Sequence, residues 1–330
     1  MSVLRVEALQ THFFTDAGVV KAVDGVSFSL DAGEVLGLVG ESGSGKSVTG
    51  FSILRLVDPP GRVAGGRILF QGEDLAAVPE RAMRRLRGKK IAMIFQDPMM
   101  TLNPVLRIDT QMIEAVRAHE RVSVKAARAR AAQALARVGI PSPSERLSAY
   151  PHQFSGGMRQ RVAIAIALLN GPELIIADEP TTALDVTIQS QILAEVQGLA
   201  RETGTALIWI THDLAVVAGL ADRIAVMYAG RIVESGSSKA ILTQPRHPYT
   251  AGLLGSIPGH GSGRARRGEP LTQIPGMAPN MAHLPPGCAF APRCPRAADL
   301  CRAAAPDTTP LGPDRALRCH LPLEAAGAAA

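Results

Sequence analysis

The sequence predicts an α/β protein with a mainly parallel sheet, an antiparallel β layer at its start and a helical insertion. Short apolar runs begin at Val35, Ile91, Leu174, Ala206 and Ile224, and helical stretches separate them. Strands that alternate with helices in this way form parallel sheets. A G-x-x-x-x-G-K-[ST] pattern directly after the first of these runs adds the loop of a P-loop NTPase core.

The first thirty residues have a different pattern. From Val3 to Leu30, apolar and polar residues alternate, and the alternation is broken at Asp16-Ala17-Gly18. A period of two residues with a short turn is typical of paired antiparallel strands. We therefore expect an antiparallel β layer before the parallel core.

The glycine-rich segment is Gly40-Glu41-Ser42-Gly43-Ser44-Gly45-Lys46-Ser47, between the apolar run Val35–Val39 and a helical stretch that extends to Leu56. Glycines allow backbone N–H groups to surround phosphates, and the helix amino terminus adds its positive dipole end. The lysine reaches phosphate oxygens and the last serine can ligate Mg²⁺. The alternative is a Gly/Ser turn with an exposed lysine. The predicted contacts to a nucleotide triphosphate are Gly40, Ser42, Gly43, Ser44, Gly45, Lys46 and Ser47.

Two acidic residues follow another apolar run. Leu174 to Ala177 is apolar, and Asp178 and Glu179 come next. We expect Asp178 to hold Mg²⁺ through water and Glu179 to orient or polarise the attacking water. Taken alone, two acids after an apolar run are often a solvated loop or a helix start. The Lys46 motif makes the second half of a phosphoryl-transfer site the favoured interpretation.

The segment Phe154 to Arg161 reads Phe-Ser-Gly-Gly-Met-Arg-Gln-Arg and leads into an apolar helical run. A Ser-Gly-Gly turn at a helix start is an anion site. This segment resembles the signature of the ATP-binding subunits of ABC transporters. The resemblance continues in order through Gln96 after the strand Ile91–Phe95, through Ala183-Leu184-Asp185, and through His212 after the strand Ala206–Thr211.

The resemblance implies a head-to-tail dimer of two ATPase subunits, in which each ATP lies between one phosphate loop and the partner's signature helix. Ser155, Gly156 and Gly157 are then expected to act on the partner's nucleotide. Gln96 is expected to sense the γ-phosphate and to share Mg²⁺ with Ser47 and Asp178. His212 is expected to contact the γ-phosphate, and Asp185 to join the two sites. Without the ordered set, a Gln or His at a strand end is an ordinary polar residue.

An aromatic residue is expected to stack on adenine. Phe13 matches the place where the resembled family carries that aromatic residue, and the neighbouring Phe14 is the alternative. The further alternative is that one of the two is simply a core residue. The sequence leaves this choice open.

The domain organisation follows from these motifs. Residues 1–258 are expected to form the ABC ATP-binding domain, with a helical subdomain at about 97–157 that includes a helix over Ala126–Val138. In the resembled family this insertion docks on membrane subunits; the alternative is an ordinary helical decoration. Residues 259–330 are expected to form a linker and a carboxy-terminal extension.

The extension has motifs of its own. Pro245-Arg246-His247-Pro248-Tyr249-Thr250 stands before it, and the segment Pro286 to Pro295 reads Pro-Gly-Cys-Ala-Phe-Ala-Pro-Arg-Cys-Pro. Together they resemble the carboxy-terminal extension of oligopeptide and dipeptide importer ATPases. The resemblance then covers nearly the whole chain.

All 4 cysteines lie in this extension, at Cys288, Cys294, Cys301 and Cys319. Clustered thiols in a reducing cytoplasm indicate metal binding more than disulfides. Four thiolates can hold zinc or a [4Fe-4S] cluster. The resemblance implies the iron–sulfur cluster; Zn²⁺ and unligated thiols are the alternatives. His320 could replace one thiol, although a surface role for it is the simpler interpretation.

Composition sets limits on the function. The chain has 330 residues, 46 % of them hydrophobic, and a net charge of +6. No apolar stretch approaches the ~18 to 20 residues needed to cross a bilayer, and Met1 to Glu7 has no signal-peptide pattern. The basic clusters Arg81 to Lys90 and Arg264 to Arg267 lack interleaved aromatics. We therefore expect a cytoplasmic protein that does not bind nucleic acid.

These observations predict the ATPase subunit of a bacterial ABC importer for peptides, at the cytoplasmic face of the inner membrane. The expected partners are two transmembrane permease subunits, a second ATPase subunit and, through the complex, a solute-binding protein. One alternative is the same machine with nickel, glutathione, a sugar or another small solute as cargo. The other is a soluble ABC ATPase that acts in iron–sulfur assembly or on nucleic acid.

Overall fold

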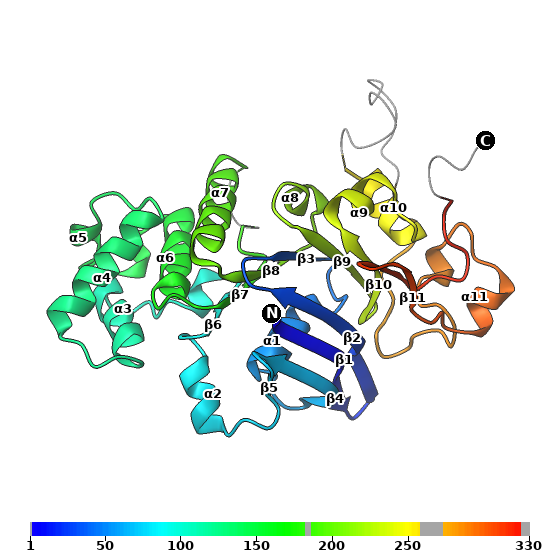
Figure 1. Cartoon of the computed structure of the whole chain (residues 1–330), viewed down its shortest axis with the longest axis horizontal. Coiled ribbons are helices and arrows are strands. Elements are labelled where there is room, and N and C mark those ends of the chain that lie inside the picture. The colour runs from blue at the N-terminus through cyan, green and yellow to red at the C-terminus, as the bar shows by residue number, and fades with distance from the viewer. Residues whose placement is uncertain (1, 182–185, 258–272, 325–330) are drawn as a thin grey trace. The chain divides into compact units, whose positions relative to one another are not determined.

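The structure is a computed structural model that describes residues 2–181, 186–257 and 273–324. The chain divides into two compact units. The first unit comprises residues 1–4, 30–34 and 69–209, and the second comprises residues 5–29, 35–68 and 210–330. Each unit contains strands, helices and buried apolar side chains of its own (Figure 1).

An antiparallel β layer opens the second unit. The long strands β1 (Ser2–Thr15) and β2 (Gly18–Asp31) are joined by a two-residue turn and therefore run antiparallel. β4 (Gly61–Phe70) lies on the other side of β1, which gives the order β2-β1-β4. The alternating sequence and the turn at residues 16–18 predicted this layer, and the structure confirms it.

A five-stranded sheet segment forms the rest of the β structure in the second unit. Its order is β11-β12-β10-β9-β3, and β3 pairs parallel with β9. β9 and β10 are joined at Ala229-Gly230, where φ is 47° and 78°. Two consecutive residues with positive φ suit a tight hairpin. This edge of the sheet is therefore antiparallel, so the expected mainly parallel order applies only to β3–β9 within this segment. The bounds are β3 (Val35–Val39), β9 (Arg223–Tyr228), β10 (Arg231–Ser237), β11 (Thr309–Gly312) and β12 (Arg315–Leu317).

The first unit contains the strand order β8-β7-β6. β6 pairs parallel with β7, and Ile91 lies opposite Leu174. All five residues of β7 and all six of β8 are buried, as expected for central parallel strands. The bounds are β6 (Ile91–Ile94), β7 (Leu174–Asp178) and β8 (Ala206–Thr211), and the short β5 (Glu73–Asp74) pairs with the end of β4.

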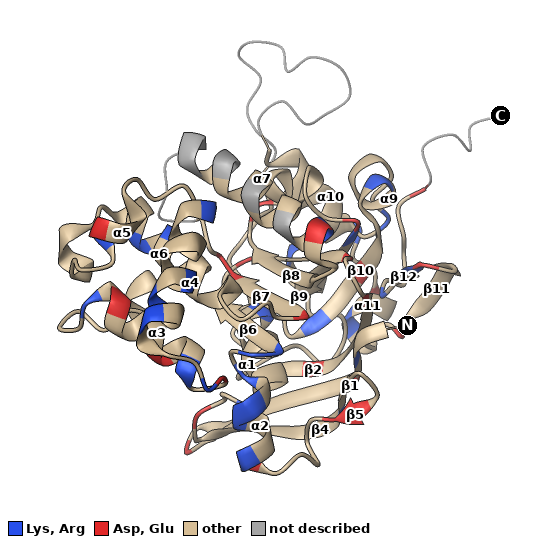
Figure 2. Ribbon diagram, turned by 60° about the vertical axis from the view of Figure 1, so that its left-hand side comes forward, with Lys and Arg blue, Asp and Glu red and all other residues tan. Residues whose placement is uncertain are grey.

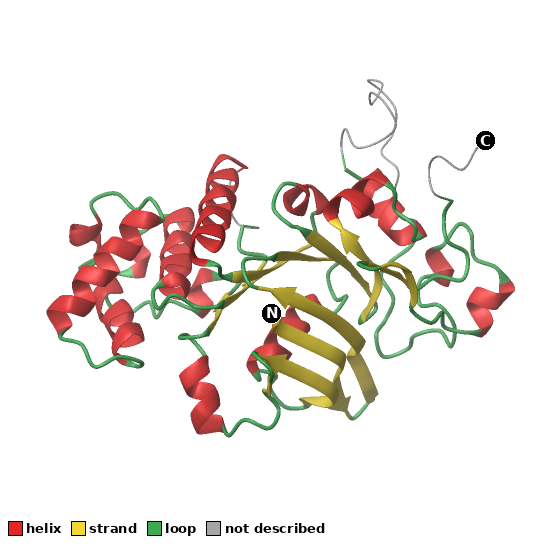
Figure 3. Ribbon diagram, viewed as in Figure 1, coloured by secondary structure: helices red, strands yellow, loops and turns green. Residues whose placement is uncertain are grey.

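The helical insertion lies in the first unit. Helices α3, α4, α5 and α6 gather at one end of this unit, with no strand among them (Figures 1 and 3). Along α4 the buried residues are Ala127, Ala131 and Leu135, so one face of this helix packs inward with a four-residue spacing. The bounds are α2 (Glu80–Leu86), η1 (Pro98–Met100), α3 (Ile108–Arg117), α4 (Val124–Arg137), α5 (Pro143–Arg146), η2 (Pro151–Gln153), α6 (Gly156–Leu168) and α7 (Val186–Thr203).

Among the described residues, the longest helix of the second unit has 9 residues. The helices of this unit are α1 (Lys46–Leu54), α8 (Leu214–Ala218), α9 (Ser238–Thr243), α10 (Pro248–Gly255), η3 (Ala291–Arg293) and α11 (Asp299–Ala303). Within the part of the chain that the structure describes, no helix has both the length and the apolar character needed to cross a membrane.

The basic segment Arg81 to Lys90 is partly neutralised by carboxylates. Arg87 pairs with Glu80 at 2.6 Å, and Lys89 and Lys90 pair with Glu120 and Glu173. Figure 2 shows residues of both charges over the helices of the first unit. This segment is therefore a surface of mixed charge.

Candidate functional site

The glycine-rich loop lies between β3 and α1, in the strand–loop–helix order that the sequence predicted. β3 is buried throughout and ends at Val39, and Gly45 is the N-cap of α1. The helix ends at Leu54 and not at Leu56, because Arg55 has a left-handed conformation with φ of 54°. The loop therefore stands at the carboxyl end of a parallel strand, where ligands of open α/β sheets bind.

Two glycines of this loop are required by the backbone around them. A Cβ atom on Gly40 would lie 2.2 Å from the Met227 carbonyl oxygen, and one on Gly45 would lie 2.3 Å from the Ala22 carbonyl oxygen. Gly45 also has φ of 100°, which side chains disfavour. The loop is thus packed tightly against β2 and β9, with its backbone fixed on that side.

Lys46 and Ser44 are the buried polar groups of the loop. Lys46 is 5 % exposed, and its Nζ donates to the carbonyl oxygens of Gly40 at 2.7 Å and Glu41 at 3.0 Å. The Oγ of Ser44 is buried without a hydrogen-bond partner among the described residues. A buried hydroxyl without a partner is costly unless a ligand satisfies it. Ser47 follows in the first turn of α1, half-buried. These groups fit an anionic ligand on the loop.

The first unit brings together two of the three predicted catalytic residues. Asp178 is the last residue of β7 and is 4 % exposed. Glu179 follows it with φ of 44°, a left-handed conformation that is rare for glutamate. Gln96, which follows β6, donates from Nε2 to Oε2 of Glu179 at 3.2 Å. The parallel pairing of β6 with β7 explains why their ends meet. Strain of this kind concentrates at functional sites.

The predicted signature segment stands at the start of α6. Ser155 is the N-cap, and its side chain accepts a hydrogen bond from the Met158 backbone at 3.3 Å. Ser155 and Gly156 are exposed, and a Cβ on Gly156 would meet nothing within 4 Å. The helix amino terminus is therefore open to a ligand from outside the chain, as the expected action of Ser155, Gly156 and Gly157 on a partner's nucleotide requires.

His212 follows the last residue of β8 and is exposed. Its neighbour Asp213 caps α8 by accepting from the Ala215 backbone at 2.7 Å, and Thr211 Oγ1 accepts from the Asp213 backbone at 3.1 Å. The segment on both sides of His212 is thus fixed. Its predicted role remains a prediction, as does that of Asp185, which lies outside the described residues.

The two candidates for adenine stacking have different surroundings. Phe13 packs on Gly61 of β4, where a Cβ would lie only 2.6 Å from the ring. Phe14 is 39 % exposed and lies under the Arg62 guanidinium, with 4.5 Å between the guanidinium carbon and the ring centroid. Both aromatic residues therefore have partners within the β layer, and the choice of Phe13 remains a prediction.

The four cysteines are unpaired thiols in the extension. Burial raises the pKa of Cys288 and Cys294, and it raises the pKa of Cys319 to about 11, with the neighbouring thiols contributing in the same direction. The backbone N–H of Cys288 donates to the carbonyl oxygen of Cys301 at 2.7 Å, so these two residues are neighbours. Among residues 2–181, 186–257 and 273–324, however, no group of three or more His, Cys, Asp and Glu side chains has a metal-binding arrangement. The expected metal set is therefore not assembled in this structure.

A buried carboxylate fastens the extension to the sheet. Glu234 of β10 is fully buried and accepts hydrogen bonds from the backbone N–H groups of Arg246 and His247, both at 2.9 Å. Arg315 of β12 donates to the same carboxylate at 2.8 Å. The segment before α10 and the last strand of the extension therefore share one anchor. The predicted linker from residue 259 lies mostly outside the described residues.

His247 makes this anchor sensitive to pH. It is 1 % exposed, and its Nδ1 accepts from the Tyr249 backbone at 3.0 Å as the cap of α10. Burial lowers the pKa of His247 to about 4, against a hydrogen bond to the Arg318 backbone that raises it. In the unfolded chain the same histidine has a pKa near 6.5. Its contribution to stability is therefore complete above pH 6.5 and is lost as the pH falls toward 4.

We expect the free energy of unfolding to fall by about 2 kcal/mol between pH 7 and pH 5 from His247 alone. His247→Asn keeps a capping side chain and removes the titration. Urea unfolding of both proteins at the two pH values measures the effect as the difference in their pH dependence. Equal pH dependence of the two proteins would show that His247 is already solvated in the folded chain.

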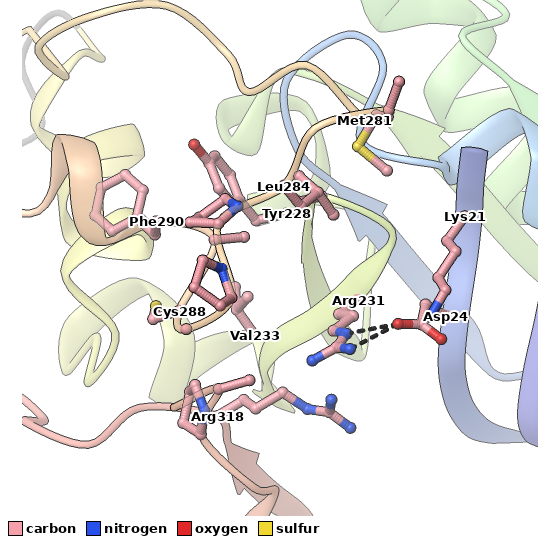
Figure 4. A pocket seen from close by; sticks show the side chains of 18 of the residues that line it. Lys21, Asp24, Tyr228, Arg231, Val233, Met281, Leu284, Cys288, Phe290 and Arg318 are labelled. Atoms are coloured by element: carbon pink, nitrogen blue, oxygen red, sulfur yellow. Dashed lines mark hydrogen bonds and ion pairs between the residues drawn. The ribbon is translucent and has the colours of Figure 1, made fainter. Parts of the chain in front are cut away.

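A cavity of about 270 Å³ lies in the second unit between β2, the β9–β10 hairpin and the extension. Figure 4 shows Arg231 paired with Asp24 and Arg318 beside this pair. The Nη2 atom of Arg231 lies 2.6 Å from Oδ2 of Asp24. Burial raises the pKa of Asp24, but the bond to Arg231 outweighs it, so the net shift is downward. With Lys21 the lining holds three cations and one carboxylate. No residue of the loop 40–47 lines this cavity.

A second, smaller cavity of about 60 Å³ does involve the loop. Its lining combines Glu41, Ser42, Gly43 and Ser44 with Tyr228 and Ala229 of the β9–β10 hairpin and with Ala278, Pro279 and Met281 of the extension. The extension therefore covers one side of the loop. No pattern in the sequence indicated this contact, because the two segments are far apart in the chain.

Comparison with known proteins decides the family. Residues 23–182 match the ABC transporter family, and residues 233–301 match the oligopeptide/dipeptide transporter C-terminal region. The dipeptide transport ATP-binding protein DppD of Escherichia coli (strain K12) is 48 % identical over 327 residues, which cover 99 % of each chain. The chain belongs to the ATP-binding subunits of oligopeptide/dipeptide-type ABC transporters. This confirms the family expected from the signature and from the extension.

Other relatives agree with this membership. DppD of Bacillus subtilis (strain 168) is 51 % identical and covers 97 % of this chain and 94 % of its own length. The oligopeptide transport ATP-binding protein OppD of the same organism is 53 % identical, covering 88 % of this chain and 80 % of its own. The dipeptide and oligopeptide relatives are thus about equally similar.

Solved structures confirm the fold. The dimeric structure of MJ0796, a bacterial ABC transporter cassette, has a TM-score of 0.65 and 26 % identity, and covers 71 % of this chain and 98 % of its own. The same cassette in a post-hydrolysis state bound to ADP and Pi gives the same values. The fold is therefore the ABC cassette, and the chain is an ABC-type ATPase.

Proposed function

We propose that this protein is the ATP-hydrolysing subunit of a bacterial ABC importer that takes up dipeptides or oligopeptides. The observation that carries this proposal is 48 % identity to a dipeptide transport ATP-binding protein over 99 % of both chains. The intact loop at residues 40–47 and the Gln96–Glu179 contact support ATP hydrolysis in this chain itself.

The second unit supplies the groups proposed to bind the triphosphate. Lys46 exchanges its two carbonyl partners for phosphate oxygens, and Ser44 finds in the ligand the partner that its buried hydroxyl lacks among the described residues. Gly40, Ser42, Gly43 and Gly45 leave the loop backbone accessible to the phosphates. Phe13 is proposed to stack on adenine.

The first unit supplies the groups proposed for hydrolysis. A water molecule attacks the γ-phosphorus, the bond to the ADP oxygen breaks, and Glu179 orients the water and accepts its proton. Gln96 holds the Glu179 carboxylate and senses the γ-phosphate. His212 is proposed to contact the γ-phosphate. Ser47, Gln96 and Asp178 would hold Mg²⁺, which would neutralise charge on the phosphate oxygens.

The proposed assembly is a head-to-tail dimer of ATPase subunits on two transmembrane permeases, at the cytoplasmic face of the inner membrane. The exposed amino terminus of α6 supports this, because Ser155, Gly156 and Gly157 are available to a partner's nucleotide. Asp185 is proposed to link the two sites. The partner is a second copy or a related ATPase, and a solute-binding protein delivers the peptide.

Co-purification tests the assembly. We would tag the chain in its native host, solubilise membranes gently under anaerobic conditions and identify the retained proteins by mass spectrometry. Recovery of two multi-span membrane proteins is expected. Peptide uptake by a deletion strain then tests the cargo, with nickel and glutathione uptake as comparisons. Recovery of soluble scaffold or nucleic-acid factors alone would contradict the transport function and leave the ATPase assignment intact.

We infer further that Cys288, Cys294, Cys301 and Cys319 hold an iron–sulfur cluster of the [4Fe-4S] type. This inference is supported by the presence of four unpaired thiols in one extension, part of which matches the oligopeptide/dipeptide transporter C-terminal region. No metal-binding arrangement of three or more ligands exists among the described residues, so cluster binding would require the thiols to come closer together. Zn²⁺ is the competing occupant.

Anaerobic purification followed by iron, sulfide and zinc analysis and by visible absorption distinguishes these occupants. About four irons and four sulfides per chain, with a broad visible absorption, are expected for a [4Fe-4S] cluster. Zinc in place of iron, or a metal-free protein of normal ATPase activity from the native host, would contradict the cluster.

A further inference from the structure

One side chain of the extension forms an ion pair with the loop 40–47. Arg293 of η3 forms a two-bond ion pair with Glu41, the second residue of the loop: Nη1 lies 2.6 Å from Oε2, and Nη2 lies 2.9 Å from Oε1. Arginine forms its strongest carboxylate contacts in this fork-like geometry. The Arg293 side chain is only 7 % exposed and the Glu41 side chain 29 %, so water screens the pair weakly.

Arg293 is itself held rigidly. Its Nε donates to the Pro275 carbonyl oxygen at 2.8 Å, and Nη1 lies 3.3 Å from the Tyr228 hydroxyl. The bond to Glu41 raises the pKa of Arg293 above its ordinary value, so the guanidinium stays charged. Tyr228 in turn packs edge-on against Phe290, with 5.2 Å between ring centroids. The Arg293–Glu41 ion pair is therefore part of a packed cluster and not a mobile surface contact.

The backbone of Glu41 is held as well. Its N–H donates to the hydroxyl of Tyr249 at 2.9 Å, and its carbonyl oxygen accepts from Lys46 Nζ at 3.0 Å. Tyr249 lies in α10 and is fully buried. Three different groups thus fix the one acidic residue of the loop, and two of them, Arg293 and Tyr249, come from beyond the strands and helices that make the nucleotide motifs.

We propose that Arg293 and Tyr249 are positioning residues that hold the phosphate loop in its ATP-binding conformation and neutralise Glu41. An unpaired carboxylate in this loop would repel the triphosphate. A loop released from Tyr249 would have to be ordered again on binding, which reduces affinity. This inference rests on the proposed function only in that residues 40–47 bind ATP, and it makes the extension part of the ATP site.

The expected effect is on ATP affinity more than on turnover. Arg293 contacts the loop and not the Gln96–Glu179 pair, so the bound nucleotide meets unchanged catalytic groups. Arg293→Gln should raise the Kd and KM for ATP about 10-fold, the value of one charge-assisted hydrogen bond, and change kcat less than about threefold. Arg293→Lys keeps the charge and should recover part of the affinity.

A double variant tests the electrostatic part. In Glu41→Gln with Arg293→Gln both charges are removed, so affinity should return to within about threefold of the unaltered chain. Arg302→Gln is the matched control. It breaks the exposed pair between Arg302 and Asp299, which lies in the same extension but does not contact the loop. This control should leave KM unchanged.

The measurements use the purified full-length chain, with nucleotide titration for Kd, steady-state hydrolysis for KM and kcat, and thermal unfolding for fold. If Arg293→Gln does not fold, Tyr249→Phe removes one oxygen atom and should still raise KM severalfold. Unchanged KM in a folded Arg293→Gln chain would overturn the inference, and an equally weak double variant would overturn its electrostatic part. Failure of the unaltered chain to bind ATP would instead contradict the proposed function.

Discussion

Glu179→Gln should lower kcat for ATP hydrolysis by about 10²- to 10⁴-fold, the usual contribution of a general base. The amide occupies nearly the same volume as the carboxylate and still accepts a hydrogen bond from Gln96, but it cannot take a proton from the attacking water. Affinity for ATP should change by less than about threefold, because the loop 40–47 and not Glu179 is proposed to hold the triphosphate. The variant should therefore bind ATP and retain it.

The measurement is steady-state phosphate release together with nucleotide titration. Glu173→Gln is a suitable control, since Glu173 lies just before β7 and pairs with Lys90 on the surface of the same unit. It should hydrolyse ATP at the unaltered rate. Residual activity above about a tenth in Glu179→Gln would remove Glu179 from the role of orienting water and would direct attention to His212.

The backbone conformation at Glu179 bears on how this comparison is interpreted. A glutamate with φ of 44° is strained, and the strain persists only because buried neighbours fix it: Asp178 before it and Pro180 after it are both buried. The backbone at Glu179 is therefore fixed, and Gln96 donates one hydrogen bond to the carboxylate. The Glu179→Gln variant inherits the same backbone, so the comparison isolates the chemistry of the carboxylate.

The parts of the site that the sequence predicted are local. The loop from Gly40 to Ser47 is recognisable because each position in this short segment needs a particular residue type. Gly40 and Gly45, for example, have no room for a Cβ atom. Asp178 and Glu179 were predictable for a similar reason, since they stand at the end of a buried strand. Their contact with Gln96 follows once β6 and β7 are known to be parallel neighbours.

The parts that the sequence did not predict are long-range. Glu41 and Arg293 are 252 residues apart, and neither position has a local pattern that requires the other. β11 has four exposed residues and no alternation, so its place at the edge of the sheet depends entirely on pairing with β12. The burial of Glu234 could not be predicted from the sequence either. Its carboxylate is fully buried because three groups donate hydrogen bonds to it, and these groups are known only from the structure.

Lys46→Ala should weaken ATP binding itself, by about 10- to 150-fold, which corresponds to the 1.5–3 kcal/mol of hydrogen bonds to a charged group. Lys46 is the buried cation of the loop, at 5 % exposure, and its ammonium lies within hydrogen-bond distance of two loop carbonyl oxygens. Its removal takes a positive charge from the site and leaves those carbonyl groups facing the phosphates.

Nucleotide titration of the purified chain measures this loss directly, and Lys239→Ala provides the matched control because Lys239 is an exposed residue of α9. Thermal unfolding without nucleotide separates weaker binding from a weaker fold. Unchanged affinity in a folded Lys46→Ala chain would contradict the phosphate-loop assignment. The two variants therefore separate ATP binding from ATP hydrolysis. Lys46→Ala should lose binding only if the loop holds the triphosphate, and Glu179→Gln should lose turnover only if the acid at the end of β7 acts on the water.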